Sequence, residues 1–98
     1  MTVLATYLSE AEDDIADAWQ IYESKQSGLG DRFASEVRRR IDLICTNPKL
    51  FGIWRRKIRA VLVEKFPFVI YYRDRGRDVL IVAVQHGKRS ARNWKHRT

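Results

Sequence analysis

The segment spanning residues 58–89 constrains the fold of this chain most strongly, because it holds three apolar runs in quick succession. The runs cover residues 58–66, 68–73 and 78–86, and only Pro67 and a four-residue Asp-Arg-Gly-Arg turn separate them. Runs of this length that are rich in Val, Ile, Tyr and Phe and bounded by Pro or Gly are typical of β-strands. The connections are too short for crossover helices, so the three strands are predicted to pair antiparallel.

The third run differs from the other two because every position from Val79 to Val84 is apolar. Continuous apolar runs indicate a strand that is covered on both faces. The run then ends in His86-Gly87-Lys88-Arg89, where apolar residues give way abruptly to basic ones. We therefore expect the function of the protein to reside at the exit of this strand.

The N-terminal half is predicted to contribute a strand over residues 2–8 and two helices over residues 10–24 and 31–46. Ser9 and Glu12 form a capping-box pattern before the first helix. Trp19 and Tyr22 lie on the apolar stripe of that helix, which predicts that both anchor the core. Glycines at 28 and 30 separate the helices, and Asn47-Pro48 ends the second. Two helices joined by so short a turn form an antiparallel hairpin.

Together these elements predict an α+β fold in one domain, residues 1–98, with the helical hairpin packed on a mainly antiparallel sheet of about four strands. Residues 49–57 are predicted to be a loop that enters the sheet. The single cysteine, Cys45, lies on an apolar helix face and is predicted to be a buried structural thiol. The sequence shows no signal peptide and no apolar run long enough to span a membrane, so we expect a cytoplasmic protein.

The net charge of +7 conceals a marked asymmetry along the chain. Residues 1–31 contain seven acids and one lysine, a balance of −6, whereas residues 32–98 contain eighteen Lys or Arg and five acids, a balance of +13. A basic sheet end of this kind indicates an anionic partner, either nucleic acid or an acidic protein segment. The alternative interpretation is a solvated surface that keeps the protein soluble.

Most kinds of chemical site are excluded by the residues present. No Cys/His pair has zinc spacing, the glycines are too scattered for a phosphate-binding loop, and the acids cluster in the first helix, so we expect no metal and no cofactor. What remains is the group His86, Lys88, Arg89 and Arg92. His86 and Arg89 are candidates for metal-free RNA cleavage, as acid or base and as phosphate clamp. The same residues are equally suited to binding alone, with Trp94 stacking on a ligand.

The chain resembles the RelE/ParE superfamily of bacterial toxins from type II toxin–antitoxin (plasmid stabilisation) modules. The most specific parts of the resemblance are Phe-Pro-Phe-Val-Ile-Tyr-Tyr at 66–72 and Val-Ala-Val-Gln-His-Gly-Lys-Arg at 82–89. The resemblance implies a helical hairpin on an antiparallel sheet and a cognate antitoxin whose acidic, amphipathic C-terminal segment wraps the toxin and covers its basic surface. The residues expected to bind that antitoxin are Arg55, Arg56, Arg59 and Tyr72.

The superfamily divides by activity. RelE-like members cut mRNA on the ribosome with basic residues of the sheet and a tyrosine in the tail, and Arg89 matches the arginine of their strand-ending motif. This chain has Phe68 where those members carry a sheet arginine, and Trp94 and Lys95 where they carry the tyrosine. ParE-like members lack these cleavage residues and act on DNA gyrase. Because this chain also lacks the sheet arginine and the tail tyrosine, the resemblance favours a ParE-like protein.

We therefore interpret the chain as a toxin that arrests bacterial growth when it is released from its antitoxin, by inhibiting DNA gyrase. The residues predicted to contact the target are Lys88, Arg89, Arg92, Trp94 and Lys95. One alternative is a ribosome-dependent mRNA endonuclease, for which Arg89 and His86 are the catalytic candidates. A second alternative is a basic nucleic-acid-binding module without toxicity.

Overall fold

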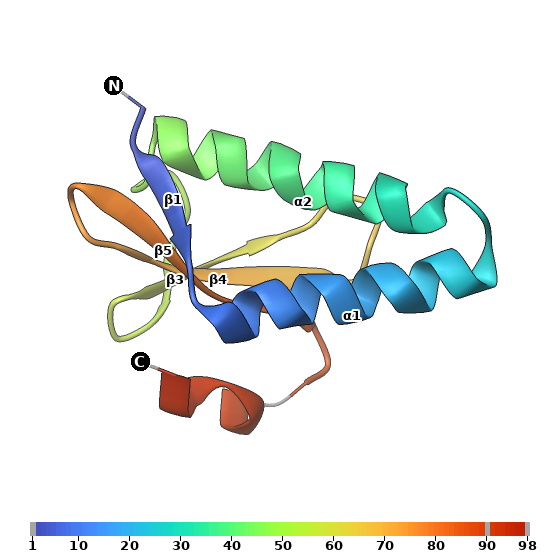
Figure 1. Ribbon diagram of the computed structural model, residues 1–98. Coiled ribbons are helices and arrows are strands. Elements are labelled where there is room, and N and C mark those ends of the chain that lie inside the picture. Colours follow the sequence, from blue (N-terminus) through green and yellow to red (C-terminus); the bar gives the residue numbers. More distant parts are fainter. Residues whose placement is uncertain (1, 90, 98) are drawn as a thin grey trace.

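A computed structural model describes residues 2–89 and 91–97. A helical hairpin covers one face of a five-stranded sheet, and a short C-terminal segment lies on the side of the sheet away from α2 (Figure 1). The elements in chain order are β1 (Leu4–Tyr7), α1 (Ser9–Lys25), α2 (Leu29–Thr46), β2 (Ile53–Arg55), β3 (Ile58–Leu62), β4 (Phe68–Asp74), β5 (Asp78–His86) and the 3-10 turns η1 (Ala91–Asn93) and η2 (Lys95–Arg97).

The strand order is β1-β5-β4-β3-β2, with β1 parallel to β5 and every other pair antiparallel. The α+β fold and the antiparallel meander predicted from the sequence are confirmed. The number of strands is five instead of about four, because β2 forms within the segment predicted to be a loop. This strand has three residues, all exposed, and its pairing with β3 is irregular. A strand this short and this exposed does not produce the alternation of apolar and polar residues from which a strand is predicted.

Strand β5 contains a bulge that explains part of its continuous apolar pattern. Tyr71 lies opposite Ala83 and Tyr72 opposite Ile81, so Val82 is an extra residue on β5. Val82 and Ala83 consequently pack in the same cluster, away from the helices, and Val84 returns to the helix face. Without the extra residue, strict alternation from Ile81 would place Val84 on the face away from the helices.

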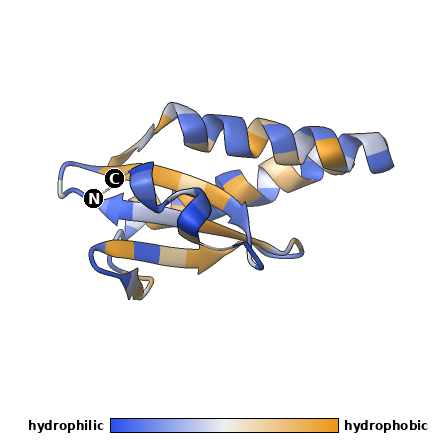
Figure 2. Ribbon diagram, turned by 90° about the horizontal axis from the view of Figure 1, so that it is seen from below, coloured by the Kyte–Doolittle hydropathy of each residue, from blue (hydrophilic) through white to orange (hydrophobic). Residues whose placement is uncertain are grey.

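The main core lies between the helical hairpin and the sheet. Its largest fully buried side chains include Phe33 and Ile44 from α2, Ile70 and Tyr72 from β4, and Ile81 from β5. Figure 2 shows hydrophobic residues concentrated along the strands, while the turns and the C-terminal segment are hydrophilic. The predicted burial of Cys45 is confirmed, at 6% exposure, and this burial raises the pKa of its thiol.

The hairpin turn is held by side chains of α1 that accept or donate hydrogen bonds at the start of α2. Glu23 accepts from the backbone N–H groups of Gly28 and Gly30, at 2.9 and 3.0 Å. Because these amides are satisfied, α2 begins at Leu29, two residues before the predicted start. Gly30 also lies where a Cβ would be 2.7 Å from the carbonyl oxygen of Trp19, so the helices approach closely there.

Two expectations about α1 are wrong. Trp19 is not a core anchor: it is 36% exposed and its Nε1 donates to Asp31 Oδ1 at 2.9 Å, which places it at the outer edge of the hairpin. The capping box is absent as well. Leu8 is the N-cap residue, without a side-chain cap, and the Ser9 hydroxyl donates to Glu10 instead. Leu8 takes this position because its N–H is still bonded to Ile81, as the continuation of β1.

The second face of the sheet is covered by the C-terminal segment 91–97, which we call the tail. Trp94 is 2% exposed and packs with Ile58, Tyr71, Val82 and Ala83. The centroids of the Trp94 and Tyr71 rings are 4.3 Å apart. The tail therefore gives β5 its cover on the face that the helices do not reach.

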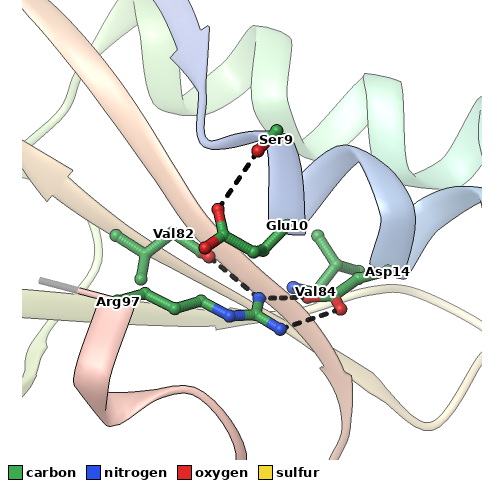
Figure 3. Close-up of polar contacts among 6 residues, drawn as sticks. All are labelled: Ser9, Glu10, Asp14, Val82, Val84 and Arg97. Atoms are coloured by element: carbon green, nitrogen blue, oxygen red, sulfur yellow. Dashed lines mark hydrogen bonds and ion pairs between the residues drawn. The ribbon is translucent and has the colours of Figure 1, made fainter.

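A nearly buried ion pair, here called the tail clamp, attaches the tail to the sheet (Figure 3). Arg97 Nη1 donates to Asp14 Oδ2 at 2.7 Å and to the Val82 carbonyl at 3.2 Å, and Nη2 donates to Asp14 Oδ1 at 3.2 Å. The Val84 N–H donates to the same carboxylate at 3.0 Å. The side chains of Arg97 and Asp14 thus satisfy the Val82 carbonyl and the Val84 N–H. Both groups lie beyond Ile81, where the pairing of β5 with β1 ends.

Breaking the tail clamp should destabilise the protein, because Asp14→Ala leaves the Arg97 guanidinium largely buried without a counter-charge. We expect the free energy of unfolding in urea to fall by about 3–5 kcal/mol. The control is Asp13→Ala, which removes an exposed acid from the adjacent position of α1 and should change stability by less than about 0.5 kcal/mol. Equal stabilities of the two variants would contradict the assigned role of the clamp.

The junction of β1 and β5 predicts a pH-dependent contribution to stability. Hydrogen bonds from Arg75 and then from Thr6 lower the pKa of Asp78 to about 2, from its ordinary value of 3.8. A carboxyl group with a depressed pKa in the folded state stabilises it above the ordinary pKa and loses that contribution as pH falls through the folded-state pKa. The stability advantage over Asp78→Asn should therefore disappear between about pH 4 and pH 2, as measured by urea unfolding. A difference that stays constant over this range would refute the interaction.

Candidate functional site

The residues predicted to contact a target do not form one surface but line two separate hollows. His86, Lys88 and Arg89 line a cleft of about 530 Å³ between α1 and the end of β5, which we call the strand-exit cleft. Trp94 and Lys95 line a hollow of about 370 Å³ between the β2–β3 turn and the tail, which we call the tail pocket. Arg92 lies exposed on η1.

The strand-exit cleft is built by the turn that follows β5. The Gly87 N–H donates to the Pro67 carbonyl at 2.8 Å, and the Arg89 N–H donates to the His86 carbonyl at 2.9 Å. This turn leaves Lys88 and Arg89 exposed, and within residues 2–89 and 91–97 neither of them forms an ion pair. The exit is therefore free to make contacts with another molecule.

The opposite wall of the cleft belongs to α1 and carries carboxylates. Asp14 and Asp17 line it together with Lys25, so the cleft has mixed charge. Asp14 is neutralised by Arg97, whereas Asp17 is exposed. A phosphodiester in this cleft would meet a carboxylate as well as cations, which disfavours RNA as its ligand.

His86 is poorly placed to act as a general base. Its Nδ1 accepts a hydrogen bond from the Lys88 N–H at 3.1 Å, and its ring packs edge-on against Phe68 with the centroids 5.6 Å apart. With Nδ1 as the acceptor, a neutral ring carries its proton on Nε2. Neither nitrogen then has a free lone pair to take a proton from a hydroxyl group. The geometry thus suits a positioning role for His86 in the turn.

The tail pocket gathers residues that the sequence predictions assigned to different partners. Arg55 and Arg56, expected to contact an antitoxin, lie beside Trp94 and Lys95, expected to contact a target. Trp94, however, is buried against Tyr71, so it shapes the pocket instead of presenting a surface of its own. Its assignment as a target contact is corrected on this ground.

Tyr72 requires a second correction, and Arg59 lies beside it. They lie opposite each other on β3 and β4, facing the helix side of the sheet. Tyr72 is fully buried and its hydroxyl donates to the Pro48 carbonyl at 2.7 Å, while Arg59 Nη1 donates to the Phe51 carbonyl at 2.6 Å. Both side chains hold the loop after α2 against the sheet. Tyr72 has no surface for an antitoxin, and burial raises the pKa of its hydroxyl.

Sequence reasoning missed four residues that line the tail pocket: Trp54, Ile58, Arg73 and His96. Trp54 lies on the strand that was predicted to be a loop. Arg73 ends the second predicted run and pairs with Ile58 across β3 and β4. The signal that could have found Arg73 is the register of the β3–β4 hairpin, because this register places the end of β4 beside the start of β3.

Two further observations limit the chemistry of the described residues. Among residues 2–89 and 91–97, no group of three or more His, Cys, Asp or Glu side chains is arranged to hold a metal ion. In the same part of the chain, neither helix is long and apolar enough to cross a membrane.

Comparisons with known proteins agree on one family. A family model described as the ParE toxin of the type II toxin–antitoxin system parDE matches residues 6–91. Among solved structures, a chain of the chromosomal ParDE TA system from P. aeruginosa superposes with a TM-score of 0.75 and 12% sequence identity. That superposition covers 87% of this chain and 96% of the other, and at this identity it concerns the fold alone. No curated protein gives a significant match.

Proposed function

Because this chain belongs to the ParE toxin family of type II toxin–antitoxin systems, we propose that it inhibits DNA gyrase by binding and arrests growth once its antitoxin is removed. The observation that carries the proposal is the strand-exit cleft. It presents two exposed cations without intramolecular ion pairs among the described residues, beside a histidine that is engaged in the turn. Such an exit of mixed charge is suited to recognising a protein surface of complementary charge, and its histidine is not free to act as the base that RNA cleavage needs.

The alternative of an mRNA endonuclease receives no support from the geometry. Metal-free cleavage needs a base for the 2′-hydroxyl, an acid for the leaving oxygen and cations for the phosphorane. Lys88 and Arg89 supply cations, but His86 has no free acceptor nitrogen and the facing wall carries Asp17. The inhibitor assignment is therefore preferred.

The cations at the strand exit are the proposed target contacts, with Arg92 and Lys95 as further exposed cations on the tail. Trp94 contributes by holding the tail in place. An antitoxin partner follows from the family, and we retain the expectation that its acidic, amphipathic segment covers basic surface of this chain. Arg55 and Arg56 are exposed and remain proposed contacts for it.

Removing the strand-exit cations should weaken gyrase inhibition without unfolding the protein. We expect the double substitution Lys88→Ala and Arg89→Ala to raise the concentration needed for half-inhibition of supercoiling at least about tenfold, corresponding to ~1.4 kcal/mol. Arg77→Ala is the matched control, because it removes an exposed cation at the β4–β5 turn, at the other end of β5. Circular dichroism and thermal unfolding should show both variants folded.

Assays of the purified wild-type toxin decide between gyrase inhibition and mRNA cleavage. Gyrase cleavage complexes are measured beside the mapping of mRNA ends on translating ribosomes. Codon-aligned mRNA cuts with unchanged supercoiling would contradict the proposal and establish the endonuclease. Unaffected growth on induction of the folded protein without its antitoxin would exclude toxicity altogether.

A further inference from the structure

Among residues 2–89 and 91–97, the tail pocket is lined by cations from three separate elements and by no carboxylate. Arg55 and Arg56 come from β2 and the turn after it, Arg73 comes from β4, and Lys95 comes from η2. In contrast to the strand-exit cleft, an anion that enters this pocket meets charge of one sign. The pocket is therefore the better anion site of the two.

Trp54 and Trp94 contribute aromatic rings to the same site, and Tyr71 packs against both of them. The Trp54 ring centroid lies 5.3 Å from Tyr71 and 5.4 Å from Trp94, and the Tyr71 and Trp94 rings are 4.3 Å apart. Tyr71 and Trp94 are buried, so they fix the position of Trp54, which is 44% exposed. The Arg55 guanidinium lies 5.9 Å from the Trp54 centroid. A rigidly held, half-exposed indole beside arginines is a platform for a flat ring.

A buried donor in the pocket lacks an acceptor. Trp94 Nε1 has no hydrogen-bond partner among the described residues, although buried polar groups are almost always paired. Trp94 lines the pocket, but its indole nitrogen is itself buried from solvent, so it is an unsatisfied group of the pocket wall and is not counted as a ligand contact.

Arg56 has a backbone conformation that an arginine rarely adopts. Its φ of 53° lies in the left-handed region, which favours glycine or asparagine. Non-glycine residues in this region carry backbone strain. The strain also offers a test, because asparagine at this position removes the charge and relieves the backbone.

We propose that the tail pocket binds single-stranded nucleic acid, with a base against Trp54 and its phosphates among Arg55, Arg56 and Lys95. A hollow of about 370 Å³ is comparable to small-molecule sites and suits one nucleotide. Bases of a duplex are stacked on one another, so they cannot lie against the indole. A purely acidic peptide would satisfy the cations but would leave the exposed ring without a stacking partner. The site shares only Lys95 with the proposed gyrase contacts, and its occupancy can be measured without gyrase.

The test measures fluorescence anisotropy of labelled probes with the purified full-length toxin. The probes are a ten-residue oligothymidylate, the corresponding ten-base-pair duplex and a decaglutamate peptide. DNA is chosen because it lacks the 2′-hydroxyl, so cleavage of the probe cannot confuse the result. The oligothymidylate should bind saturably and more tightly than the other two probes. Its affinity should fall with salt, with a slope near −0.7 for each phosphate contacted.

Two substitutions separate the site from general charge attraction. Arg56→Asn should weaken oligothymidylate binding roughly tenfold. Its matched control is Lys65→Asn, because Lys65 is also exposed, cationic and left-handed, with φ 69°, but lies in the β3–β4 turn outside the pocket. Lys65→Asn should change the affinity less than twofold. Trp54→Leu should weaken binding by roughly tenfold through loss of stacking.

Three results would overturn the proposal. The first is an absence of saturable oligothymidylate binding. The second is an equal loss in Arg56→Asn and Lys65→Asn, which would indicate attraction by net charge alone. The third is binding of decaglutamate as tight as that of the oligonucleotide, which would assign the pocket to the acidic segment of the antitoxin. If Trp54→Leu does not fold, the Arg56→Asn and Lys65→Asn pair decides the question.

Discussion

The need to cover both faces of β5 governs the rest of the structure. This strand is almost entirely apolar, and the helical hairpin can shield only one of its faces. The other face is shielded by Trp94, and the tail that carries Trp94 is held by the pairing of Asp14 with Arg97. A contact between residues 83 positions apart thus determines whether the sheet has a second core. The tail pocket lies against the segment that this contact fixes.

This arrangement links packing to function in a specific way. The tail forms one wall of the tail pocket, and Asp14 of the clamp lies on the wall of the strand-exit cleft. The bulge at Val82 serves the same arrangement, because it turns two successive residues of β5 toward the tail and returns Val84 to the helices. The two surfaces differ in kind: one is of mixed charge beside an engaged histidine, and the other is uniformly cationic and aromatic.

The sequence was sufficient for the features that depend on local pattern. The strand over residues 78–86 was predicted with its observed boundaries, since an unbroken apolar run between a turn and a glycine admits little else. The helical hairpin and the burial of Cys45 followed from apolar periodicity. The capping by Glu23 and the exposure of Trp19 could not be predicted, because both arise where α2 crosses α1. The division of the basic residues into two hollows was equally inaccessible, because it depends on where the tail folds back.

Trp94 and Tyr72 show why site residues were harder to predict than the fold. An aromatic residue in a basic tail and a tyrosine in a strand are residue types typical of binding sites, but both side chains are buried in this chain.

The most direct test of the account is a two-dimensional nuclear Overhauser spectrum of the free toxin. It should show strong cross-peaks between the indole protons of Trp94 and the ring of Tyr71, with residues 91–97 dispersed as in a folded segment. Random-coil resonances for the tail without such cross-peaks would contradict it, because neither the second core nor the tail pocket would then exist.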